Sequence, residues 1–169
     1  QTRLDSLVLF SSLGFANAAT AYAGRAVAAG RFREARMAGL WASVHAILFG
    51  SLLVGFYLQQ SDLVVAWFLP QPSARLLELT AVYFGIAAWA QVLGAGALGA
   101  MGATYGAGSM IAPMLVDLGA FLISGCLLWW VASASGDLAA CYWALLIGMA
   151  VVLLGQLLTV VFWVRKPGL

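Results

Sequence analysis

Long apolar runs divide the sequence into five segments, each long enough to cross a membrane as a helix. A bilayer-spanning helix needs roughly 20 predominantly apolar residues. The segments between these runs are short and contain most of the charged residues. We therefore predict an all-α integral membrane protein, a single bundle of five transmembrane helices over residues 1–169. The predicted spans are about 6–24, 37–58, 76–101, 110–131 and 138–164.

The amino-acid composition excludes an ordinary soluble domain. Of the 169 residues, 64% are hydrophobic and only 8% are charged. A soluble domain has about 45–50% apolar and about 25% charged residues. The formal net charge of +2 is too small to indicate a nucleic-acid partner. We therefore expect the lipid bilayer to be a partner of this chain, and no nucleic acid.

The segment 91–110 is rich in glycine and alanine. Its small residues recur one helical turn apart, as in Gly102-xxx-Gly106. In water, each glycine would weaken a helix by roughly 0.5–1 kcal/mol relative to alanine. In a membrane, small residues let neighbouring helices approach closely. We predict that this segment belongs to the central helix of the bundle, pressed against neighbours on several sides.

Basic residues predict the orientation of the chain. The segment Gly24–Arg36, predicted as the loop between the first two spans, contains four arginines and one acid. Cytoplasmic loops are enriched in Lys and Arg. This loop, the turn Tyr105–Ser109 and the tail at Arg165 should therefore lie in the cytoplasm, with Gln59–Arg75 and Ala132–Asp137 outside. The first span then enters from outside, as expected for an incomplete six-helix unit, so we expect a fragment of a longer chain.

Three helix starts are predicted from capping residues, whose side chains accept hydrogen bonds from exposed backbone N–H groups. Ser61 or Asp62 should begin a short interfacial helix that ends at Pro70. Ser109 is the expected cap of the fourth span, and Asp137 that of the fifth.

Asp117 is the clearest ionisable residue at membrane depth. Such residues are costly in hydrocarbon and usually face the bundle interior or a cavity. Two interpretations stay open from the sequence. Asp117 is either a protonated carboxyl bonded to a neighbouring helix, or a group that accepts a proton or contacts a cation in a cavity.

Other polar residues in the spans give weaker indications. His45 is either a packing residue or a titrating group. Asn17 forms a small, polar stripe with Thr20, Ala21 and Gly24, which binds another helix or lines a pathway. Gln91 and Gln156 suit hydrogen bonds between helices better than contacts with a substrate. The candidates for a transport pathway or ion coupling are Asp117, His45, Asn17, Gln91 and Gln156.

The sequence contains no catalytic pattern. It has one histidine and two separated cysteines, Cys126 and Cys141. These give no metal-ligand spacing, no nucleophile–base pair and no phosphate-binding loop. We therefore expect neither an enzyme nor a bound cofactor or metal.

The segment 17–36 has an ordered set of small and polar motifs. A small-residue run is followed by a glycine, a Gly-containing pair and an Ala-Arg pair. It resembles the second or eighth helix and following loop of multidrug and toxic compound extrusion transporters, the MATE family. The matching residues are Gly24, Ala29, Gly30, Ala35 and Arg36, with Arg25 where the family has Gln.

Two later segments extend the resemblance. The segment 97–104 is similar to the stretch after the tenth helix of the family. The segment 132–156 is similar to the last loop and helix, with Trp143 before a Gly-containing apolar run. In the first of these segments, Leu98, Gly102 and Thr104 agree, whereas Gly99 and Ala103 stand where Arg and Asp are common.

The resemblance implies the C-terminal half, helices eight to twelve, of a twelve-helix transporter with two six-helix lobes around a cleft. The partner would be the missing N-terminal lobe of the same protein. Such transporters export small cationic or amphipathic compounds in exchange for H⁺ or Na⁺. It also implies a plasma membrane, the inner membrane in a bacterium, with a cytoplasmic C-terminus.

One departure from the family pattern points to a branch. Gln91 matches a glutamine of the tenth helix, but Ala88 stands where some branches have an acid, and Phe84 where they have Tyr. The chain therefore looks closer to the DinF-like branch, whose coupling acids lie in the N-terminal lobe. Two alternatives stay open: a lipid-linked oligosaccharide flippase of the same superfamily, and a non-transporting scaffold subunit.

Overall fold

The computed structural model describes residues 2–60 and 73–164, with side chains described from residue 6 onward. The short helix expected from Ser61 or Asp62 to Pro70 lies outside the described residues, as does the basic tail at Arg165.

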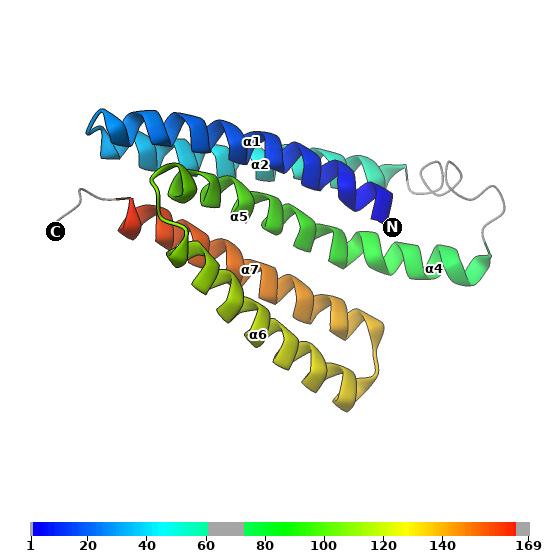
Figure 1. Cartoon of the computed structure of the whole chain (residues 1–169). Helices are drawn as coiled ribbons and strands as arrows, with labels where there is room; N and C mark the ends of the chain where they lie inside the picture. Colours follow the sequence, from blue (N-terminus) through cyan, green and yellow to red (C-terminus); the bar gives the residue numbers. More distant parts are fainter. Residues whose placement is uncertain (1, 61–72, 165–169) are drawn as a thin grey trace.

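Five long helices make up the described structure (Figure 1). All five are long and apolar enough to cross a membrane, which confirms the predicted all-α membrane class. The third is a continuous 33-residue helix that contains a π-helical segment, η1. The elements are α1 (Thr2–Ala28), α2 (Phe32–Gln59), α4 (Ala74–Val82), η1 (Tyr83–Ala87), α5 (Ala88–Gly106), α6 (Ile111–Ser135) and α7 (Leu138–Trp163).

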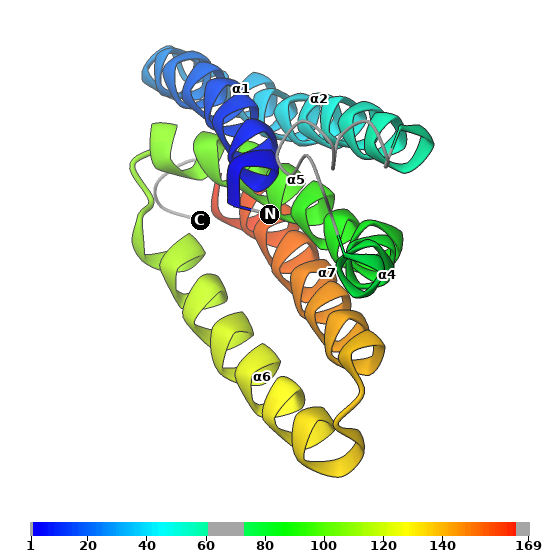
Figure 2. The same cartoon turned by 90° about the vertical axis from the view of Figure 1, so that its right-hand side faces the viewer.

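Helix α5 lies at the centre of the bundle. It packs against the α1–α2 hairpin on one side and against α7 on the other (Figure 2). Helix α6 packs chiefly against α7 and diverges from the rest of the bundle. The predicted central position of the glycine-rich helix is thus confirmed.

Glycines bring α5 into backbone contact with its neighbours. A Cβ atom at Gly102 would collide with the Ala16 carbonyl of α1, and one at Gly106 with the Thr20 carbonyl. Toward α2, a Cβ atom at Gly99 would lie 2.7 Å from the carbonyl carbon of Ala42. Only glycine permits these approaches without a shift of the helices.

The arginine-rich segment is mostly helical, so the predicted loop Gly24–Arg36 was too long. Helix α1 continues to Ala28, and α2 begins at Phe32. Alanine and arginine are good helix formers, which explains why both helices continue. The chain reverses at Gly30, whose φ of 72° favours glycine, and the Arg31 N–H donates to the Ala26 carbonyl across 2.8 Å.

The predicted cap at Ser109 was wrong, whereas the one at Asp137 is confirmed. Ser109 belongs to the end of α5, because its N–H donates to the Thr104 carbonyl across 3.0 Å after Gly108 adopts a φ of 80°. Helix α6 then begins at Ile111 without a side-chain cap. The Asp137 side chain accepts from the Ala139 N–H across 3.1 Å.

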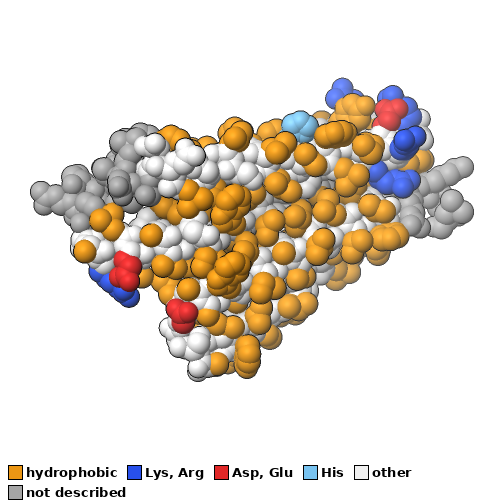
Figure 3. Space-filling view, turned by 180° about the vertical axis from the view of Figure 1, so that it is seen from behind, with side chains coloured by type: hydrophobic (Ala, Val, Ile, Leu, Met, Phe, Trp, Pro, Cys, Tyr) orange, Lys and Arg blue, Asp and Glu red, His pale blue; other side chains and the backbone are white. Residues whose placement is uncertain are grey.

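Charged side chains gather at the two ends of the bundle, and hydrophobic side chains cover the surface between them (Figure 3). The α1–α2 turn, the α5–α6 turn and the end of α7 share one end (Figure 1). The α6–α7 turn lies at the other end, as does the start of α4. There, Arg75 forms an ion pair with Glu78 across 2.7 Å. This arrangement suits a bilayer and supports the predicted alternation of the loops.

Candidate functional site

Asp117 of α6 is bonded to Gln156 of α7. The Gln156 side chain is fully buried, and its Nε2 donates to Asp117 Oδ1 across 2.7 Å. The same amide donates to the carbonyl oxygen of Pro113 across 3.1 Å. One glutamine therefore joins the first two turns of α6 to the last third of α7.

Thr159 lies beside the oxygen of this amide. Its hydroxyl donates to the Gln156 carbonyl across 2.7 Å and lies 3.4 Å from Gln156 Oε1. A carboxylate and a carbonyl can only accept from the amide, so Nε2 must face Asp117 and Pro113, with Oε1 toward Thr159. The spacing Gln156-x-x-Thr159 was visible in the sequence but is too common to identify the site.

Asp117, Gln156 and Gln91 line one cavity of about 210 Å³. Its walls come from α1, α5, α6 and α7, and they are otherwise mostly apolar. The fourth polar side chain is Ser12, whose hydroxyl donates to the Val8 carbonyl in its own helix across 2.5 Å. The packing brings together three of the five candidates predicted from the sequence.

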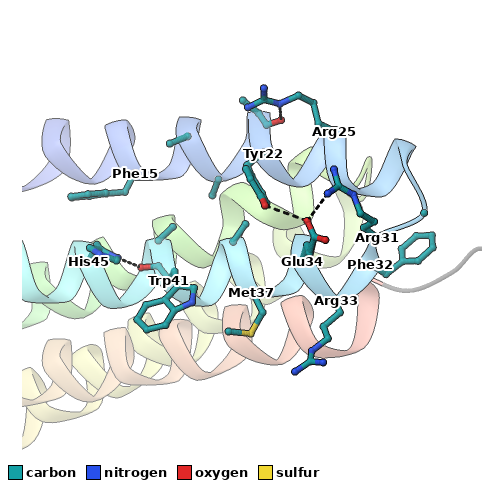
Figure 4. Close-up of a pocket in the computed structure, with 16 residues that line it drawn as sticks. Phe15, Tyr22, Arg25, Arg31, Phe32, Arg33, Glu34, Met37, Trp41 and His45 are labelled. Atoms are coloured by element: carbon teal, nitrogen blue, oxygen red, sulfur yellow. Dashed lines mark hydrogen bonds and ion pairs between the residues drawn. The ribbon is translucent and has the colours of Figure 1, made fainter.

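His45 does not belong to this cavity. It is exposed on α2, and its Nδ1 lies 2.7 Å from the Trp41 carbonyl. Because a carbonyl only accepts, Nδ1 is the donor in this contact. The ring lies 6.2 Å from that of Phe15 and 5.9 Å from that of Trp41 (Figure 4).

Asn17 is also separate, because its predicted stripe divides between two environments. Thr20 donates to the Gly102 carbonyl of α5 across 2.9 Å, and Gly24 lies against Gly106. Asn17 and Ala21 are exposed beside them. The stripe therefore binds α5 through its inner half only.

The π-helical segment η1 lies one turn before Gln91, and no pattern in the sequence indicates it. It buries Tyr83 and Phe84 in an aromatic cluster with Tyr57 of α2. Such segments are rare and often occur at functional sites. Its position places a break in helical register next to the cavity.

Comparison with known families decides the assignment. The sequence model of the MatE family matches residues 1–131. This chain belongs to the MatE family. No curated protein and no solved structure matches it. As a MatE protein it is a multi-pass membrane protein of a transporter family and not an enzyme.

The MatE match divides the candidate site. Asp117 and Gln91 lie within the matched residues, whereas Gln156 lies beyond them on α7.

Within residues 2–60 and 73–164, no group of three or more His, Cys, Asp or Glu could hold a metal ion. Asp117 is the one carboxyl group that the structure places on the cavity. The other polar side chains there are two amides and a hydroxyl.

Proposed function

We propose that this MatE chain is the C-terminal half, helices eight to twelve, of a DinF-like antiporter. The transporter exports small cationic or amphipathic compounds in exchange for H⁺ or Na⁺. Its two lobes rock around a site near the middle of the membrane, which gives alternating access. The proposed location is the inner membrane of a bacterium, with the α1–α2 turn in the cytoplasm.

The unpartnered surface of α6 supports an incomplete lobe. Most large apolar side chains of this helix are exposed, among them Phe121, which is 74% exposed. Helix α6 packs chiefly against α7, and the Asp117 cavity lies among α1, α5, α6 and α7. A further helix seated there would cover both the cavity and the inner face of α6.

The Asp117–Gln156 hydrogen bond is the observation that carries a proposed contribution of Asp117 to coupling, in addition to the coupling acids that the DinF-like branch has in its N-terminal lobe. A carboxyl group can release a proton or attract a cation, and the neighbouring amide can donate to it in either state. Because Gln156 joins the carboxyl to α7, a change of charge at Asp117 acts on the packing of α6 against α7. In this proposal the packing of α6 against α7 has two arrangements, and an ion bound at Asp117 favours one of them.

The charge of the cavity favours a cationic substrate over the flippase alternative. Its described lining contains one acid and no Lys, Arg or His. A lipid-linked oligosaccharide carries phosphate and would need basic residues in the pathway. An organic cation meets an attractive carboxylate and apolar walls instead.

Transport by the full-length protein in proteoliposomes tests the coupling role. Asp117→Asn keeps an acceptor for Gln156 but cannot release a proton, so we expect normal stability and altered efflux of a fluorescent cation across a pH series. Asp137→Asn is the matched control, because asparagine also caps helices. Unchanged efflux of the Asp117→Asn variant at every pH would leave Asp117 as a packing residue. A wild-type protein without any efflux would favour the scaffold alternative.

A further inference from the structure

A second and larger cavity lies between α1 and α2 at their basic end (Figure 4). This α1–α2 groove has a volume of about 1140 Å³ and is lined by α1, the turn at Gly30 and α2. It extends along α2 from Arg31 to His45. It is separate from the Asp117 cavity, and the proposed transport mechanism does not use it.

The rim of the groove has excess positive charge. Arg25, Arg31 and Arg33 line it together with a single acid, Glu34. Glu34 Oε2 is engaged by Arg31 Nη1 across 3.0 Å and by the Tyr22 hydroxyl across 3.3 Å.

Arg25 and Arg33 account for the excess positive charge at the rim. Within the described part of the chain, neither has a carboxylate partner within ion-pair distance. Arg25 Nε donates to the Ala21 carbonyl of its own helix across 3.2 Å. Figure 4 shows both guanidinium groups directed away from Glu34. They are available to an anion at the membrane surface.

The walls of the groove are apolar and reach into the membrane. Phe15 of α1 and Met37 and Trp41 of α2 line it below the arginines. At 1.5 Å per residue, the path along α2 from Arg31 to His45 measures about 20 Å. Half of the hydrocarbon core is about 15 Å thick. The groove therefore runs from headgroup level to the depth of the acyl chains.

We propose that the α1–α2 groove binds an anionic phospholipid. The arginines hold the phosphate of the headgroup, and an acyl chain lies against Phe15, Met37 and Trp41. Basic pockets between transmembrane helices are suited to such headgroups. The excess positive charge disfavours an organic cation at this place, and the apolar walls favour a lipid over a free phosphate ion.

Native mass spectrometry of the protein purified in detergent tests the charge requirement. Phosphatidylglycerol and phosphatidylcholine with identical acyl chains are the probes. We expect phosphatidylglycerol to be retained preferentially. Replacing each of Arg25, Arg31 and Arg33 by Gln should weaken its retention roughly fivefold per residue, and by an order of magnitude or more together. The matched control Arg75→Gln, at the opposite end of the bundle, should not change it.

A second set of variants tests the apolar requirement. Trp41→Ala should weaken binding of both lipids, whereas Trp129→Ala, an exposed tryptophan of α6, should not. An excess of inorganic phosphate should not displace the bound lipid. Equal retention of the two lipids, equal loss in the Arg75→Gln control, or displacement by phosphate would each overturn the proposal. The single variants Arg25→Gln and Arg33→Gln keep the test valid if the triple variant fails to fold, since both residues are exposed and lack described carboxylate partners.

Discussion

Thr20 of α1 and Gly102 of α5 are joined by a hydrogen bond across 2.9 Å, in the region where glycines of α5 lie against the backbone of α1. The Thr20 hydroxyl is also 2.9 Å from the Ala16 carbonyl, so its proton is shared between the two helices. Among the side chains described from residue 6 onward, close packing and this shared donor hold the α1–α5 pair together, and no ion pair joins the two helices.

Gly102→Ala should destabilise the protein by about 1–3 kcal/mol, the typical cost of overpacking. The new methyl group would meet the Ala16 backbone, which cannot yield unless the helix moves. Thermal unfolding in detergent measures the change. Gly125→Ala on α6 is the matched control, because nothing lies within 4 Å of its Cβ position. Equal stability of the two variants would contradict the close approach.

Gln156→Leu and Asp117→Leu should each lower stability, and their effects should not add. Hydrogen bonds between transmembrane helices contribute about 0.6 kcal/mol on average and up to about 1.7 kcal/mol. We expect a coupling energy in this range from a double-mutant cycle based on unfolding. Additive effects would show that the 2.7 Å bond makes no net contribution.

Cysteine labelling in oriented membranes should place the two ends of the bundle on opposite sides. In a background without Cys126 and Cys141, a cysteine at Ala29 should react from the cytoplasm and one at Ser135 from outside. The reason is the excess of arginines at the α1–α2 turn. Labelling of the Ala29 position from outside would invert the proposed topology.

The 169-residue chain reconstituted alone should show no ion-driven efflux, because one lobe supplies only one wall of the proposed cleft. Fluorescent-cation efflux under an imposed H⁺ or Na⁺ gradient is the measurement, with the full-length protein as the positive control. Gradient-dependent efflux by the 169-residue chain would refute the half-transporter interpretation.

Much of this fold could be predicted because hydrophobicity and length determine membrane helices so directly. The spans and the central position of the Gly102 helix followed from apolar runs and small residues. The short length of the loop within Gly24–Arg36 did not, because helices continue into water when their residues are good helix formers. Ser109 was misassigned because a local pattern does not show which of two adjacent helices a serine belongs to.

The candidate site was only partly predictable for a different reason. Asp117, Gln91 and Gln156 were identified individually, since polar residues are rare in such spans. Their meeting at one cavity depends on how α6 and α7 rotate against α5, which the sequence pattern does not fix. His45 and Asn17 were equally conspicuous as polar residues, yet the same packing leaves them elsewhere.

The π-helical segment gives the third transmembrane helix two registers that can change independently. On one side of η1, the glycines of α5 are fixed by backbone contact with α1 and α2. On the other side, α4 buries none of its residues. Each residue of an α-helix turns the chain by about 100°. Removing Gly85, which has open space around its Cβ position, would restore an ordinary helix and turn α4 by about that angle. Evolution could thus present a new face of α4 to its surroundings while the core of the bundle stays unchanged.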